Sequence, residues 1–164
     1  RDGRIYCCPI DAPQVLVIEP ATQSLSMFGD LSDGEDKWYG CVLADNDVIY
    51  CIPHNAPQVL AIDSRTRSTS LFGELGRSGD QKWAGGVLCA DGLIYCAPGK
   101  ADCILVIDPG RRTVSTFGFV GSSRTKKWSG AVLGPDGLIY CIPASASQIL
   151  VIDPETRTLA EYGG

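Results

Sequence analysis

Few residues of this 164-residue chain could carry acid–base or nucleophilic chemistry. Its only histidine is His54, in the segment Pro-His-Asn-Ala-Pro, and no serine, cysteine or aspartate stands at a spacing typical of a catalytic partner. The Gly-x-Ser-x-Gly, phosphate-loop and dinucleotide-binding motifs are absent from the sequence. We therefore predict no catalytic residue, and we interpret His54 as an exposed loop residue.

Eight cysteines offer disulfide or zinc chemistry. There is no Cys-x-x-Cys pair, which argues against zinc. Half of the cysteines recur at one position of a sequence repeat and are expected to lie too far apart to bridge one another: Cys7, Cys51, Cys96 and Cys141. Buried free thiols are the default interpretation, and they favour a reducing compartment, either the cytoplasm or an organelle. The alternative is one cross-strand disulfide, between Cys41 and Cys51.

Charge excludes some partners. The net charge is -5 and no basic stripe is present, so we expect no nucleic-acid binding. The segment from Asp30 to Lys37 is acidic, but its oxygens do not alternate as in a calcium loop, so we predict no metal site and no cofactor. No apolar run approaches the roughly 18 residues of a transmembrane helix, which predicts a soluble protein.

A repeat of about 45 residues organises the sequence. Trp38, Trp83 and Trp128 are 45 residues apart, and tyrosines recur at nearly the same period. Such a period suits propeller blades, solenoid units or two-helix repeats. Each complete unit contains four short segments rich in Val, Ile, Leu, Tyr and Phe and bounded by turn residues, and none has a helical apolar stripe. The units are therefore built from strands.

The turns indicate how these strands pair. Gly134-Pro135-Asp136-Gly137 suits a type I turn with glycine at positive φ, and Asp47 takes the glycine's place in an earlier copy. The aspartates that end the third strands, such as Asp63 and Asp153, can accept a backbone N–H at the next turn. The first and second strands, and the third and fourth, are therefore expected to form antiparallel hairpins.

The sequence predicts an all-β fold, a β-propeller of four-stranded antiparallel blades. The first strand of each unit contains small residues, as expected near a propeller axis, whereas the fourth is polar, as expected at the outer edge. The tryptophans and the aromatic residues that end the fourth strands should pack between blades. Residues 1–164 form one propeller region, divided into a partial blade at 1–29 and blades at 37–73, 82–118 and 127–164.

The motif Asp-Gly-Leu-Ile-Tyr-Cys followed by Leu-Val-Ile-Asp-Pro resembles the YVTN and related lactonase-like or lyase-like β-propeller repeats. The closer similarity is to uncharacterised proteins of unicellular algae and protists with tandem Lys-Trp-x-Gly-Gly-Val-Leu repeats. The resemblance covers the whole chain and implies the propeller fold. It implies no site residue here, because enzymes of the wider group use a histidine or a metal at the propeller centre and His54 occurs only once.

The first unit lacks its first strand, since nothing resembling Lys-Trp-x-Gly precedes Arg4. An open sheet edge exposes unpaired backbone groups. We therefore expect either part of a larger propeller, of about six to eight blades, or self-association or a protein partner that completes the open edges.

One face of the propeller is expected to vary between repeats. The loops after the second strands and the linkers between units emerge on the same side, and they differ most from copy to copy. The binding candidates on this face are Asp11, Asp33, Glu35, His54, Asn55, Lys100, Asp102, Arg124, Lys126 and Lys127. We favour a non-enzymatic protein-binding scaffold, such as a peripheral subunit of a larger complex. The alternatives are a lactonase-like or lyase-like enzyme with an axial site and a ligand-sensing propeller.

Overall fold

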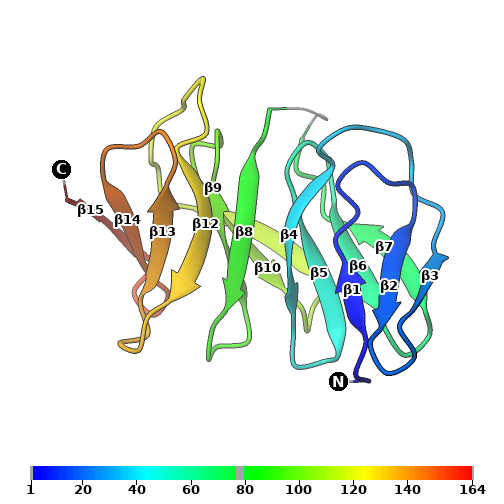
Figure 1. Cartoon of the computed structure of the whole chain (residues 1–164). Coiled ribbons are helices and arrows are strands. Elements are labelled where there is room, and N and C mark those ends of the chain that lie inside the picture. The colour runs from blue at the N-terminus through cyan, green and yellow to red at the C-terminus, as the bar shows by residue number, and fades with distance from the viewer. Residues whose placement is uncertain (1, 77–79, 164) are drawn as a thin grey trace.

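The computed structural model describes residues 2–76 and 80–163, and in these residues the chain forms strands without any helix. Figure 1 shows four antiparallel sheets standing side by side in chain order, with β4, β8 and β12 toward the viewer. Within the described ranges, no helix is long and apolar enough to cross a membrane. The predicted all-β fold of antiparallel blades is confirmed.

Each sheet is a meander in which consecutive strands pair. The first sheet has three strands: β1 (Ile5–Cys7), β2 (Val15–Glu19) and β3 (Ser24–Phe28). The second has β4 (Trp38–Leu43), β5 (Val48–Pro53), β6 (Val59–Asp63) and β7 (Ser68–Phe72). The third has β8 (Trp83–Leu88), β9 (Ile94–Pro98), β10 (Ile104–Asp108) and β11 (Thr113–Phe117). The fourth has β12 (Trp128–Leu133), β13 (Ile139–Pro143), β14 (Ile149–Asp153) and β15 (Thr158–Tyr162).

The turns have the predicted chemistry. Gly92 and Gly137 adopt φ of 78° and 83° in the first hairpin of their sheets, and Asp47 adopts 62° at the same place. In the second hairpin, the Asp63 carboxylate accepts hydrogen bonds from two turn N–H groups at 2.9 and 3.2 Å. The sequence did not reveal that the residue before each outer strand also has positive φ: Gln23, Arg67, Arg112 and Arg157, at 54° to 55°.

A tryptophan fills the junction between each sheet and the one before it. Trp83 is 4% exposed and packs against Tyr50 and Ile52 of the second sheet. Its indole N–H donates to the carbonyl of Cys103 at 2.9 Å, so the one polar atom of the ring is satisfied. Trp38 and Trp128 occupy the two other junctions in the same way. The predicted packing of these residues between blades is confirmed.

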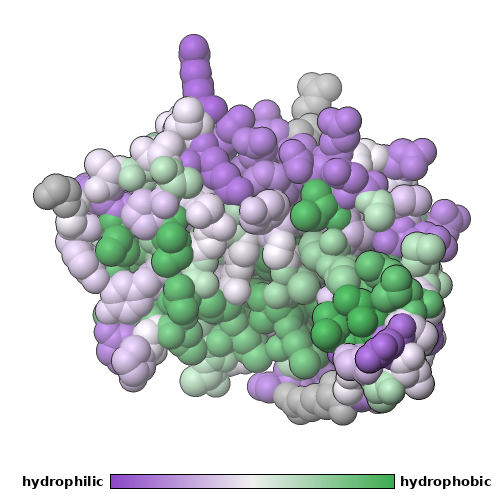
Figure 2. Space-filling model, in the orientation of Figure 1, coloured by the Kyte–Doolittle hydropathy of each residue, from purple (hydrophilic) through white to green (hydrophobic). Residues whose placement is uncertain are grey.

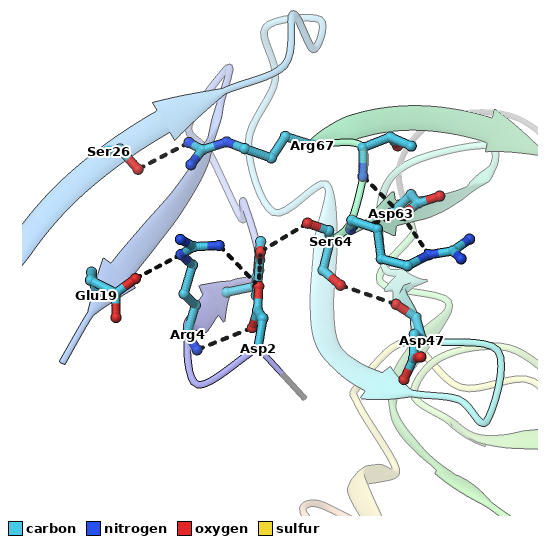
Figure 3. A network of polar contacts seen from close by, with 11 residues as sticks. Asp2, Arg4, Glu19, Ser26, Asp47, Asp63, Ser64 and Arg67 are labelled. Carbon is cyan, nitrogen blue, oxygen red and sulfur yellow. Dashed lines mark hydrogen bonds and ion pairs between the residues drawn. The ribbon is translucent and has the colours of Figure 1, made fainter. Parts of the chain in front are cut away.

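Polar contacts cross the same junctions at the end opposite the linkers. In each case a tyrosine hydroxyl lies 3.3 Å from a turn carbonyl oxygen of the next sheet: Tyr6 and Ser64, Tyr50 and Pro109, Tyr95 and Pro154. Figure 3 shows the first junction, where Arg67 donates to Ser26 at 3.0 Å and its guanidinium carbon lies 5.2 Å from the Phe28 ring centroid. These repeated contacts fix the angle between neighbouring blades.

Candidate functional site

The loops that could carry function gather on one end of the blades. We call this surface the loop face; it consists of residues 9–14, 54–58, 99–103 and 144–148 after the second strands, and of the described linker residues 29–37, 73–76, 80–82 and 118–127. Backbone bonds join loop and linker, such as Lys82 N to His54 O at 2.9 Å. In Figure 2 hydrophilic residues dominate the upper part, where Figure 1 places the linkers, and apolar residues lie below.

Two depressions lie at equivalent places of successive blades on the loop face. The first has a volume of about 400 Å³, and its lining includes the acidic Asp33 and Glu35 together with the apolar Trp38 and Leu71. The second has a volume of about 580 Å³. Its charged lining is mixed and consists of Asp80, Lys82, Lys100, Asp102 and Arg124. The structure thus brings six of the predicted binding residues, Asn55 among them, to two concave sites.

Asp11 and Asn55 accept hydrogen bonds from the backbone of the following linker on this face. The carboxylate of Asp11 accepts the backbone N–H of Asp36 at 2.7 Å, and the side-chain oxygen of Asn55 accepts the N–H of Gln81 at 3.0 Å. Both bonds hold the end of the next linker in place. Asn55 also lines the first depression, whereas Asp11 does not line either one.

Lys127 is one of the predicted binding candidates, and its side chain is buried in the structure. It is 8% exposed, and its ammonium donates to the carbonyls of Ala101 and Gly121. Lys37 and Lys82 are buried in the same manner, and burial lowers the pKa of Lys82 and Lys127. These three lysines tie each linker to the loop of the preceding blade.

The expectation that His54 is exposed is wrong. The residue is 3% exposed, because Tyr39 covers it with ring centroids 5.3 Å apart. Its Nδ1 lies 2.8 Å from the carbonyl oxygen of Trp83, which can only accept, so Nδ1 carries the proton and Nε2 is the acceptor. Burial lowers the pKa of His54, which keeps the imidazole neutral at pH 7.

Lys126, which precedes β12, adds to this group of side chains. Its ammonium lies 4.0 Å from the centroid of the Tyr39 ring, a cation–π distance. The sequence offered no reason to single out Tyr39, because the same place in the next two inner strands is taken by Ala84 and Ser129. His54, Tyr39 and Lys126 form a stack at the loop-face end of the inner strands β4 and β12. No group of three or more His, Cys, Asp or Glu residues suited to a metal is found in residues 2–76 and 80–163.

The two cysteines expected to face each other do so. Cys41 and Cys51 are directly paired across β4 and β5, just beyond the bulge that begins at Trp38. All eight cysteines are free thiols in the structure. A hydrogen bond from the Cys51 thiol lowers the pKa of Cys41 to about 7, whereas the pKa of Cys51 is raised by the same bond. The disulfide between them stays a prediction.

We expect Cys41 to be the first cysteine alkylated by iodoacetamide. Its lowered pKa makes it largely thiolate above about pH 7, so the rate should rise through pH 7 and level off about one pH unit higher. Cys141, whose pKa burial raises to about 12, serves as the internal control. Peptide mapping by mass spectrometry measures both. In a separate sample that has not been alkylated, oxidation of the two thiols by diamide should link Cys41 to Cys51. Equal rates of labelling at Cys41 and Cys141 would contradict the prediction.

Comparisons with known proteins support the fold. No family model matches the chain, and no curated protein does. Among solved structures, virginiamycin B lyase from Staphylococcus aureus superposes with a TM-score of 0.81 at 15% identity, covering 99% of this chain and 52% of the lyase. A streptogramin B lyase structure gives a TM-score of 0.80 at 15% identity, covering 100% and 52%.

The chain has the β-propeller fold. A third propeller-like match is hydrazine synthase from Kuenenia stuttgartiensis, with a TM-score of 0.71 at 14% identity over 98% of this chain and 46% of that one. The chain spans about half the length of the lyases it matches. The resemblance to lyase-like propellers is thus supported at the level of the fold, and the closer similarity to algal and protist repeat proteins stays a prediction.

Proposed function

We propose that this propeller region is a non-enzymatic protein-binding module that uses its loop face, in the manner of a peripheral subunit of a larger complex. The observation that carries the proposal is the pair of depressions at equivalent places of successive blades. The buried lysines and tryptophans around them are the same in each copy, whereas the charged residues that line them differ. A constant scaffold with a varied surface suits recognition of an extended partner.

The first depression favours a basic and apolar segment. Asp33 and Glu35 supply negative charge, and Trp38 and Leu71 supply apolar contact. Lys37 also lines this depression, where its ammonium donates to three backbone carbonyls and is 5% exposed; two carboxylates against one ammonium leave the charged lining net negative. A lysine-containing peptide with large apolar side chains therefore complements this site in charge and in polarity.

A pair of peptides tests the proposal. We expect a labelled peptide of alternating Lys and Leu to bind the chain more tightly than its Glu and Leu counterpart, measured by fluorescence anisotropy at low and moderate salt. The double substitution Asp33→Asn and Glu35→Gln should weaken binding about fivefold or more. Glu155→Gln, on the turn at the opposite end of the last blade, is the matched control and should change nothing. Equal binding of both peptides, or equal effects of the substitutions, would overturn the proposal.

An axial lyase-like site is the second candidate, and the stack of His54, Tyr39 and Lys126 is the observation that favours it. A matched structure is a catalytically inactive histidine-to-alanine variant of virginiamycin B lyase with quinupristin, so a histidine matters in that protein. Here Nε2 of His54 could accept a proton only if Tyr39 moved aside, since the residue is buried. Virginiamycin B incubated with the chain and followed by chromatography should stay intact. Turnover that His54→Ala abolishes would instead favour the enzyme.

A further inference from the structure

One position in the loop after the second strand holds the following linker in two blades but not in the third. In the first blade it is Asp11, whose carboxylate accepts the N–H of Asp36 at 2.7 Å. In the second blade it is Asn55, whose side-chain oxygen accepts the N–H of Gln81 at 3.0 Å. The third blade has Lys100 at this position, and an ammonium group can only donate hydrogen bonds. Lys100 therefore cannot hold the following linker in this way.

The linker after the third blade lacks the corresponding hydrogen bond. Its equivalent donor is the N–H of Lys126, for which residues 2–76 and 80–163 supply no acceptor. Loop and linker are close here, since a Cβ on Gly99 would lie 3.6 Å from Cγ of Lys126. The Lys100 ammonium makes no ion pair with a carboxylate of the described residues. An oxyanion from outside the chain can satisfy both groups, because it accepts the N–H bond and attracts the ammonium.

Arg124 gives the second depression a further cation. Lys100 lies in the loop after β9 and Arg124 in the linker before β12, and both line this depression. Arg124 is exposed, and its guanidinium makes no hydrogen bond or ion pair with any residue that the structure describes. The lining also includes Ser122, whose exposed hydroxyl can donate as well. An ammonium, a guanidinium and a hydroxyl are donors suited to a phosphate group.

The two carboxylates of this depression do not cancel its positive charge. Burial lowers the pKa of Lys82 and of Lys127, and attraction to Asp80 in the first case and to Asp102 in the second opposes that lowering. Each carboxylate thus already acts on a buried ammonium. The charged lining contains three cations and two carboxylates and is net positive, whereas that of the first depression is net negative.

The two depressions share a wall. Lys82 lines the second depression, and its ammonium donates to the carbonyls of Asn55 and Ala56 at 3.4 and 3.0 Å. Asn55 and Ala56 line the first depression. One extended segment can therefore contact both, with basic residues in the first and an anionic group in the second.

We propose that the second depression binds a phosphate group, carried by a serine or threonine side chain of the partner segment whose basic and apolar residues occupy the first depression. The identity of the partner rests on the proposed function, whereas the phosphate rests on the donors of the second depression. A phosphate monoester has three terminal oxygens and a charge of about −1.5 to −2 at pH 7, so it satisfies more donors than a carboxylate does. Lys100 and Arg124 pair with it, and the N–H of Lys126 donates to it. Phosphorylation of the partner therefore strengthens binding.

Three peptides test this site by fluorescence anisotropy. Each contains the alternating Lys and Leu segment, joined through a flexible glycine spacer to serine, glutamate or phosphoserine, and each is made in both orders. In one order, we expect the phosphoserine peptide to bind about tenfold or more tightly than the serine peptide, and the glutamate peptide to gain less than about threefold. Inorganic phosphate should remove the gain from phosphoserine, whereas chloride at the same ionic strength should not.

Two substitutions and a matched control locate the phosphate. Lys100→Asn and Arg124→Gln should each reduce the gain from phosphoserine about fivefold and leave the affinity for the serine peptide within about twofold. Lys100→Asn also supplies the acceptor that Asn55 provides in the preceding blade, so the melting temperature should rise by about 2 °C. Arg65→Gln removes the same charge at the opposite end of the blades, where the side chain is 71% exposed, and should change neither quantity.

The outcomes distinguish this proposal from the proposed function. If the phosphoserine peptide binds through Lys100 and Arg124 while the serine peptide does not bind, the phosphate site stands and the basic segment is wrong. If the serine peptide binds and phosphoserine adds nothing, or glutamate gives the same gain, the phosphate site is wrong and the first depression keeps its role. A gain that survives both substitutions would overturn the phosphate site as well. An unchanged melting temperature of Lys100→Asn would overturn the assignment of the Lys126 N–H as a phosphate donor.

Discussion

Replacing Trp83 with alanine is expected to lower the free energy of unfolding by about 3–5 kcal/mol. The ring is 4% exposed and lies between the second and third sheets, where it contacts residues of both. Its removal leaves a cavity that neighbouring blades cannot collapse to fill, because the tyrosine and arginine contacts at the other end of the junction hold them apart. Urea denaturation followed by circular dichroism measures the loss.

Two further variants separate the causes at this position. Trp83→Phe keeps most of the apolar contact but removes the indole N–H that the Cys103 carbonyl accepts, so it should cost about 1–2 kcal/mol less than the alanine variant. Phe119→Ala, at a solvent-exposed aromatic residue, should change stability by less than about 0.5 kcal/mol. If Trp83→Ala cost no more than Phe119→Ala, tryptophan would not be the residue that holds the blades together.

The blade architecture could be predicted because short stretches of sequence determine each strand and turn, and these stretches recur in every repeat. Each strand is bounded by turn residues whose φ or hydrogen-bonding need is specific, as at Asp47 and Gly137, and the structure confirms both. The spacing of Trp38, Trp83 and Trp128 then identified the residues between blades, because only a contact made in every unit recurs at the same place in every unit.

The candidate site was harder to predict from the sequence because it depends on contacts between repeats. His54 is buried by Tyr39 of its own sheet and bonded to Trp83 of the next one. The repeat alignment does not reveal this burial, because the same position holds Ile10 and Ala144, which are exposed, and Gly99, which is buried. The burial of His54 depends on Tyr39, which has no aromatic counterpart in the next two inner strands.

The linker lysines differ in burial according to whether their position varies between copies. Lys127 is preceded by a position that changes from Asp36 to Gln81 to Lys126, whereas its own position is lysine in every complete copy. The constant position proved to be the buried one, and its ammonium is held by backbone carbonyls. Linker charge counted as a whole therefore overstated the positive charge available to a partner, and comparing positions between copies separates scaffold from surface.

Replacing Gly85 with alanine is expected to destabilise the chain by about 2–4 kcal/mol. Gly85 has φ of +69°, a conformation that side chains oppose, and a Cβ there would lie 3.2 Å from the Cα of Gly130 on the neighbouring inner strand. The obstacle is backbone rather than a flexible side chain, so β8 and β12 would have to separate. Thermal and urea unfolding of the variant measure the cost.

Gly130→Ala is the matched control, because Gly130 occupies the same place in the Trp-x-Gly sequence of the next blade. Gly130 is not among the glycines with positive φ, and no atom lies within 4 Å of the position that a Cβ would take. The loss of stability should therefore stay below about 1 kcal/mol. The difference between the two variants measures the combined cost of the positive φ and of the close approach of the inner strands, separately from the general preference for alanine over glycine. Equal losses would mean that neither the backbone conformation of Gly85 nor the approach of β8 to β12 opposes a side chain, and that the inner strands are not packed as tightly as the blade geometry requires.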